Sequence, residues 1–119
     1  SQRMVKRKGG TMRLGAYSCE MKPGSQVYKE YRKKKISERH RHRWEVNNRF
    51  RSKFERDGLI ISGINFELNL VEMIELKDHP WFVGCQFHPE LKSRVLKAHP
   101  LFRGFIGAAV GYKNGKNQA

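Results

Sequence analysis

Residues 81–90 of the chain read Trp81-Phe82-Val83-Gly84-Cys85-Gln86-Phe87-His88-Pro89-Glu90. The apolar run from Trp81 to Phe87 predicts a β-strand, and a second apolar run from Val71 to Leu76 precedes it at a spacing typical of a hairpin. His88 then stands at the end of a strand. A strand end holds side chains rigidly at the edge of a sheet, and in open α/β sheets ligands bind there, so this position suits a functional group.

The pair formed by His88 and Glu90 suits proton transfer. A neutral imidazole can take a proton from a nucleophile when an acceptor holds its other ring nitrogen, and that acceptor also stabilises the imidazolium that forms. Glu90, two residues after His88, can be this acceptor. From the motif alone the alternative stays open, namely a histidine at a strand end and an unrelated surface glutamate.

Outward from this stretch, strands and helices are predicted throughout one domain that spans residues 11–112. The expected elements are a strand at 11–21, a short helix at 25–31, a helix at about 49–57, a strand at 59–61, and a closing helix from Pro100 that buries Leu101, Phe105, Ala108 and Ala109. Residues Ile36 to Val46 have few aliphatic side chains and many His and Arg, so we expect a functional loop there. The segments 1–10 and 113–119 have little to bury, which predicts a basic flexible start and a disordered tail.

Composition narrows the class of protein. A chain of 119 residues with 38% hydrophobic residues can form one core, and its 25 Lys and Arg against 11 Asp and Glu give a net charge of +14. Such charge raises nucleic-acid binding as a candidate, but the basic blocks lack the interleaved exposed aromatics of a single-strand platform, so no specific nucleic acid is expected. The sequence has no run of about 18 apolar residues and no apolar leader, which predicts a cytoplasmic protein without membrane association.

The two cysteines, Cys19 and Cys85, are too few and too far apart for a disulfide framework or a metal site. Both are expected to be structural, because a free cysteine commonly behaves as a small buried hydrophobe.

Four stretches, in this order and spacing, resemble the C-terminal half of the glutaminase domain of CTP synthases: Gly9-Gly10-Thr11-Met12-Arg13-Leu14-Gly15, Glu38-Arg39-His40-Arg41-His42-Arg43-Trp44-Glu45-Val46-Asn47-Asn48, His79-Pro80-Trp81-Phe82-Val83, and Cys85 to Glu90. The resemblance extends from Gly9 to about Tyr112. It implies an α/β fold, the C-terminal portion of a class I glutamine amidotransferase-like (flavodoxin-like) domain, with a mixed sheet and flanking helices.

The resemblance also implies a function. CTP synthases are ligases of pyrimidine nucleotide biosynthesis that make CTP from UTP, ATP and glutamine, and their glutaminase domain carries a Cys-His-Glu triad. His88 and Glu90 match the histidine and glutamate of that triad, and Arg43 matches an arginine that helps to bind glutamine. Without the resemblance, Arg43 would be read as one more surface cation.

The sequence departs from the family in what it lacks. The family's nucleophilic cysteine lies in a Gly-x-Cys-x-Gly turn, and neither Cys19 nor Cys85 has the flanking glycines. A Gly-rich phosphate loop followed by Lys and Ser or Thr is missing too, so ATP and Mg are assigned to a synthetase domain absent from the chain, and this segment is expected to hold no cofactor.

We therefore expect an inactive piece of a longer enzyme. Its expected partners are glutamine, the missing N-terminal part of the glutaminase domain, the synthetase domain and, in the intact protein, further copies in a homo-oligomer. A degenerate glutaminase domain kept for assembly is the alternative.

Overall fold

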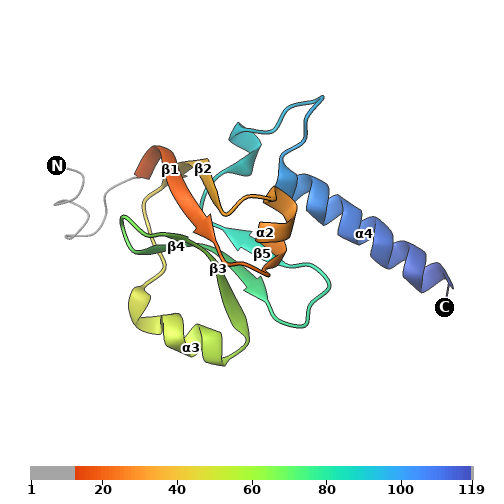
Figure 1. Ribbon diagram of the computed structural model, residues 1–119, viewed down its shortest axis with the longest axis horizontal. Coiled ribbons are helices and arrows are strands. Elements are labelled where there is room, and N and C mark those ends of the chain that lie inside the picture. Colours follow the sequence, from red (N-terminus) through yellow and green to blue (C-terminus); the bar gives the residue numbers. More distant parts are fainter. Residues whose placement is uncertain (1–12, 119) are drawn as a thin grey trace.

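The structure is a computed structural model that describes residues 13–118, so the predicted flexible segment 1–10 lies outside the described residues. A five-stranded sheet has the order β2-β1-β3-β4-β5. Its strands are β1 (Arg13–Met21), β2 (Lys35–His42), β3 (Leu59–Asn65), β4 (Leu70–Leu76) and β5 (Val83–Cys85). The helices are α2 (Gln26–Tyr31), the 3-10 helix η1 (Asn48–Phe50), α3 (Arg51–Arg56), the 3-10 helix η2 (Pro89–Leu91) and α4 (Pro100–Gln118) (Figure 1).

The predicted α/β class is confirmed. Every pairing among the described strands is antiparallel, so the parallel pairs of the expected mixed sheet are not found within residues 13–118. Chain connectivity explains this in part, because residues 66–69 join β3 to β4 and residues 77–82 join β4 to β5. Such connections are too short for the crossover that parallel strands need.

Local sequence signals predicted most elements correctly. The helix expected at 25–31 is α2, which is capped by Ser25, whose Oγ accepts a hydrogen bond from the Tyr28 N–H at 3.2 Å. The helix expected at 49–57 forms as η1 and α3, with Asn47 Oδ1 accepting from the Arg49 N–H at 3.0 Å. The strand expected at 59–61 is longer than predicted and continues to Asn65 as β3.

The predicted functional loop at residues 36–46 is wrong for most of its length, because residues 35–42 form β2. This strand pairs with β1 from Arg13↔His42 to Glu20↔Lys35. Two of its polar side chains, Glu38 and His40, are almost fully buried. A strand can bury such side chains only where other groups satisfy them, and those groups come from distant parts of the sequence.

The apolar core contains Cys19, Met21, Val27, Met73, Phe87 and Leu101. Burial, together with the charges of Glu72 and Glu38, raises the pKa of the Cys19 thiol to about 12. Cys19 is therefore a protonated structural thiol at neutral pH, as predicted, whereas Cys85 is exposed rather than buried.

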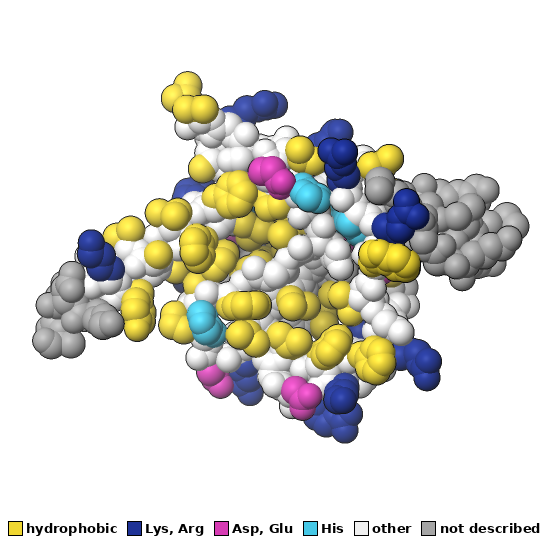
Figure 2. All heavy atoms as spheres, turned by 180° about the vertical axis from the view of Figure 1, so that it is seen from behind, with side chains coloured by type: hydrophobic (Ala, Val, Ile, Leu, Met, Phe, Trp, Pro, Cys, Tyr) yellow, Lys and Arg dark blue, Asp and Glu magenta, His cyan; other side chains and the backbone are white. Residues whose placement is uncertain are grey.

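The predicted buried face of the closing helix is wrong beyond its first turn. Leu101 is buried, but 52% of Phe105 is exposed, because α4 extends away from the sheet with little beneath it (Figure 1). The Trp81 ring lies 5.5 Å from that of Phe105. Seen from behind, hydrophobic side chains gather over the centre of the molecule and along α4, with Lys and Arg mostly around the rim (Figure 2).

No helix within residues 13–118 combines the length and the apolar character that crossing a membrane requires.

Candidate active site

His88 lies three residues beyond the end of β5, in the turn that follows the sheet. Pro89 begins η2, and its fixed φ suits the first position of such a turn. The turn is closed by the Leu91 N–H, which donates to the His88 carbonyl at 3.1 Å. This tight turn brings the side chain of Glu90 back to that of His88.

The contact between the two side chains is a direct hydrogen bond. His88 Nδ1 lies 2.9 Å from Glu90 Oε2, and the two side chains are 39% and 57% exposed. Since a carboxylate only accepts, Nδ1 carries the hydrogen, and Nε2 of the neutral ring keeps a lone pair that can take a proton. The hydrogen bond from His88 holds the pKa of Glu90 below its ordinary value. The sequence-predicted pair is thus an oriented base that is open to solvent.

The main chain of His88 is fixed on β2. The His88 N–H donates to the Arg39 carbonyl at 2.9 Å, and Lys92 Nζ donates to the Ser37 carbonyl at 2.8 Å. β2 is the outer strand of the sheet and pairs with β1 on its other side. The segment that carries His88 therefore satisfies carbonyls of a strand edge that would otherwise need water.

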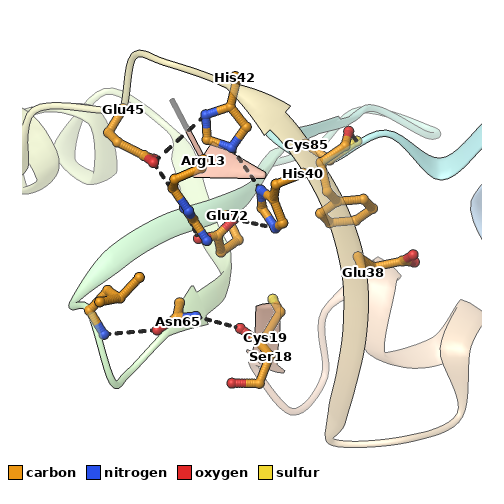
Figure 3. A network of polar contacts seen from close by, with 12 residues as sticks. Arg13, Ser18, Cys19, Glu38, His40, His42, Glu45, Asn65, Glu72 and Cys85 are labelled. Atoms are coloured by element: carbon orange, nitrogen blue, oxygen red, sulfur yellow. Dashed lines mark hydrogen bonds and ion pairs between the residues drawn. The ribbon is translucent and has the colours of Figure 1, made fainter. Parts of the chain in front are cut away.

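A layer of buried and partly buried charged and imidazole groups lies beneath this edge (Figure 3). Arg13 Nη1 donates to Glu72 Oε1 at 2.7 Å and to Glu45 Oε1 at 2.9 Å. His40 Nδ1 lies 2.7 Å from His42 Nε2, and His40 Nε2 lies 3.3 Å from Glu72 Oε2. Burial lowers the pKa of His42, although the Glu45 carboxylate opposes this effect. The layer connects β1, β2, β4 and the bend after β2.

Arg43, the predicted glutamine-binding residue, lies in the bend directly after β2 and is exposed. Within residues 13–118 it forms no hydrogen bond or ion pair with another side chain, and no contact joins it to His88. Among residues 13–118, the structure thus brings His88 and Glu90 together but does not bring Arg43 to them.

Two site-supporting residues were missed from the sequence. Glu38, a residue of β2, is buried, and its Oε2 accepts hydrogen bonds from the Tyr31 hydroxyl and from His99 Nε2. The alternation of buried and exposed positions in β2 was a signal that could have placed Glu38 and His40 on one inner face. For His99 the signal was its place just before Pro100, which is the position of a helix cap.

Among the residues that the structure describes, no group of three or more His, Cys, Asp or Glu side chains is arranged to hold a metal ion.

The hydrogen bond between His88 and Glu90 predicts a measurable titration. In the His88→Ala variant we expect the pKa of Glu90 to rise toward its ordinary value, because the bond that stabilises the carboxylate is lost. A lowered pKa in the folded chain means that this bond adds stability above the ordinary pKa and loses it as pH falls through the lowered value. An NMR titration of the Glu90 carboxyl carbon measures the shift.

The matched control for this titration is His79→Ala, which removes an exposed histidine whose Nδ1 accepts from the Trp81 N–H. We expect that variant to leave the Glu90 titration unchanged. An equal rise in both variants, or no rise in His88→Ala, would contradict the assigned bond.

Comparisons with known proteins identify the family of the chain. The family model described as glutamine amidotransferase class-I matches residues 1–108. The CTP synthase of Chlorobium phaeobacteroides is 59% identical over 117 residues, which are 98% of this chain and 21% of that protein. The CTP synthase of Geobacter metallireducens is 55% identical over 118 residues, or 99% of this chain and 22% of that protein. The chain thus spans about a fifth of the length of these relatives.

A solved structure shows the same fold. The glutaminase domain of Trypanosoma brucei CTPS with bound acivicin superposes with a TM-score of 0.81 and 32% sequence identity, covering 88% of this chain and 42% of that one. The resemblance to the glutaminase domain of CTP synthases is thereby confirmed. The chain belongs to the class I glutamine amidotransferase family.

Proposed function

We propose that this chain is the part of a CTP synthase that supplies the histidine and glutamate of its glutaminase triad. The observation that carries the proposal is the 2.9 Å bond between His88 Nδ1 and Glu90 Oε2, which leaves Nε2 as the basic nitrogen of a half-exposed ring. The relatives named CTP synthase add support at 55% to 59% identity. The intact enzyme would be a ligase that makes CTP from UTP, ATP and glutamine.

In this mechanism His88 acts as the general base. Its Nε2 takes the proton of a cysteine thiol, and the thiolate attacks the side-chain carbonyl carbon of glutamine. Collapse of the tetrahedral intermediate breaks the C–N bond, and the imidazolium returns its proton to the leaving ammonia. His88 then deprotonates the water that hydrolyses the thioester to glutamate. Glu90 orients the ring and stabilises the imidazolium in both steps.

The thiol must come from outside this chain. Cys19 is buried and protonated at neutral pH, since burial raises its pKa to about 12. Cys85 is exposed, but it ends strand β5, and its Sγ donates to the Phe87 carbonyl at 3.6 Å. Neither residue lies in the tight turn that presents a nucleophile beside oxyanion donors. The 119-residue chain is therefore proposed to be inactive by itself.

Arg43 is proposed to bind the α-carboxylate of glutamine. A guanidinium presents a planar pair of donors that matches a carboxylate. The exposure of Arg43 and its lack of an ion pair within residues 13–118 leave those donors available.

The remaining chemistry belongs to residues outside the chain. ATP, Mg and UTP would be bound by a synthetase domain, and the N-terminal part of the glutaminase domain would complete the glutamine site. We propose a cytoplasmic homo-oligomer for the intact enzyme.

The role of His88 is tested in the full-length protein that carries this chain. In His88→Ala we expect glutamine-dependent CTP formation to fall by at least about a hundredfold, because no base activates the thiol. CTP formation from free ammonia should be unchanged, since that reaction does not use the triad. Steady-state rates with each nitrogen source measure both, and loss of the ammonia reaction as well would argue against this division.

The role of Arg43 predicts a different kinetic change. We expect Arg43→Ala to raise KM for glutamine by about tenfold to a hundredfold, since a charge-assisted bond to the substrate is lost, while the ammonia reaction is spared. Arg41→Ala is the matched control, because Arg41 is an exposed arginine two residues earlier in the chain. Equal effects of the two variants, or an unchanged KM in Arg43→Ala, would remove Arg43 from the site.

A further inference from the structure

Three consecutive residues of β2 accept bonds from the segment 88–99, here called the catalytic segment. Arg39 accepts from the His88 N–H and Ser37 from Lys92 Nζ, each through its main-chain carbonyl. Between them, Glu38 accepts through its buried carboxylate from His99, the last residue of the segment. The segment is therefore attached to one short stretch of strand at its beginning, near its middle and at its end.

The hydrogen bonds of His99 fix the orientation of its ring and the position of its proton. The Leu101 N–H donates to His99 Nδ1 at 3.1 Å, so this nitrogen has no hydrogen and Nε2 is the one that donates to Glu38 Oε2. The His99 N–H in turn donates to Ser93 Oγ at 3.1 Å. His99 thus fixes its own tautomer by capping α4 and connects that helix to β2 and to the interior of the catalytic segment.

The contact between Glu38 and His99 also supports the packing of Phe87, the residue before His88. Phe87 is buried, with its ring centroid 5.8 Å from that of His40 and 6.4 Å from that of His99. A displacement of His99 would remove one wall of the site that holds Phe87. The main chain that leads into His88 would then lose part of its support.

We propose that Glu38 and His99 are positioning residues for glutamine hydrolysis, because their buried contact fixes the catalytic segment on β2 and thereby keeps the His88 ring aligned for proton transfer. The role in glutamine hydrolysis rests on the proposed function. That the contact holds His88 in place rests on the structure alone. Misplacement of a catalytic group by about 1 Å can cost about a hundredfold in rate, so a remote anchor can have a large effect.

The variants that test the proposal break this contact without removing the helix cap. In His99→Asn, the shorter side chain still caps α4 by accepting from the Leu101 N–H but does not reach Glu38. In Glu38→Asp, the carboxylate is withdrawn by one methylene group. Glu38→Gln is the conservative variant, because its amide oxygen can still accept the hydrogen bond from His99.

The matched control is Tyr31→Phe. Tyr31 donates to the same Glu38 oxygen, and its hydroxyl lies 3.2 Å from His99 Nε2, but it belongs to α2 and not to the catalytic segment. Its replacement by Phe keeps the ring and leaves the bond between His99 and Glu38 in place. If the cluster mattered only for general packing, Tyr31→Phe should have as large an effect as His99→Asn.

Two measurements are made on the full-length protein that carries this chain. In His99→Asn and Glu38→Asp, we expect amide hydrogen exchange of residues 86–92 to accelerate at least about tenfold, since the His88 N–H loses its stable bond to Arg39. We expect kcat for glutamine to fall about tenfold to a hundredfold with little change in KM, and the ammonia reaction to be spared. Tyr31→Phe and Glu38→Gln should stay close to the parent in both measurements.

The results separate this inference from the proposed function. If the parent protein hydrolyses no glutamine, the proposed function fails, and the exchange measurement alone decides whether Glu38 and His99 hold His88. If the parent is active but exchange and kcat are unchanged in both His99→Asn and Glu38→Asp, the positioning role is wrong. It is equally wrong if Tyr31→Phe accelerates exchange as much as His99→Asn does.

Discussion

The free edge of β2 is the constraint on which the rest of the structure depends. Among the described strands, β2 pairs with β1 on one side only, so the carbonyls of Ser37 and Arg39 on the other side need donors. They obtain them from Lys92 and His88, at 2.8 and 2.9 Å. The bonds that protect this sheet edge are therefore the same bonds that place the main chain of His88. This explains how a turn with a half-exposed side chain can have a fixed main chain.

The charged layer beneath β2 also depends on contacts between different elements of the fold. Arg13 is 1% exposed and lies between the carboxylates of Glu72 and Glu45, and His40 Nε2 lies 3.3 Å from Glu72 Oε2. Loss of one partner of a buried pair leaves an uncompensated charge, which costs about 3–5 kcal/mol. Each of these groups therefore requires the others in place. Through His40, which packs against Phe87, the layer connects the sheet to the residue that precedes His88.

The parts of this arrangement that the sequence predicted are those decided by near neighbours in the chain. His88 and Glu90 are two residues apart, and Pro89 between them favours the turn that joins them. The cap of α2 by Ser25 and the hairpin of β4 and β5 are local in the same way. For these features, the types and spacing of neighbouring residues were enough to predict the structure.

The parts that were missed depend on distant residues. Glu38 and His40 were assigned to a functional loop because partners such as His99 and Glu72 lie far away in the sequence. Phe105 looked buried because the periodicity of α4 continues beyond the point where the helix packs against α2. Arg43 was assigned by resemblance, and its contact with glutamine stays a prediction.

The central claim is that this chain contributes an oriented base and lacks the nucleophile that the base would activate. Its most direct test is release of glutamate from glutamine by the purified 119-residue chain, compared with the full-length protein that carries it. The account predicts release by the full-length protein and none above background by the chain alone. Release by the chain alone that disappears in His88→Ala would contradict the account, because it would require a nucleophile within these residues.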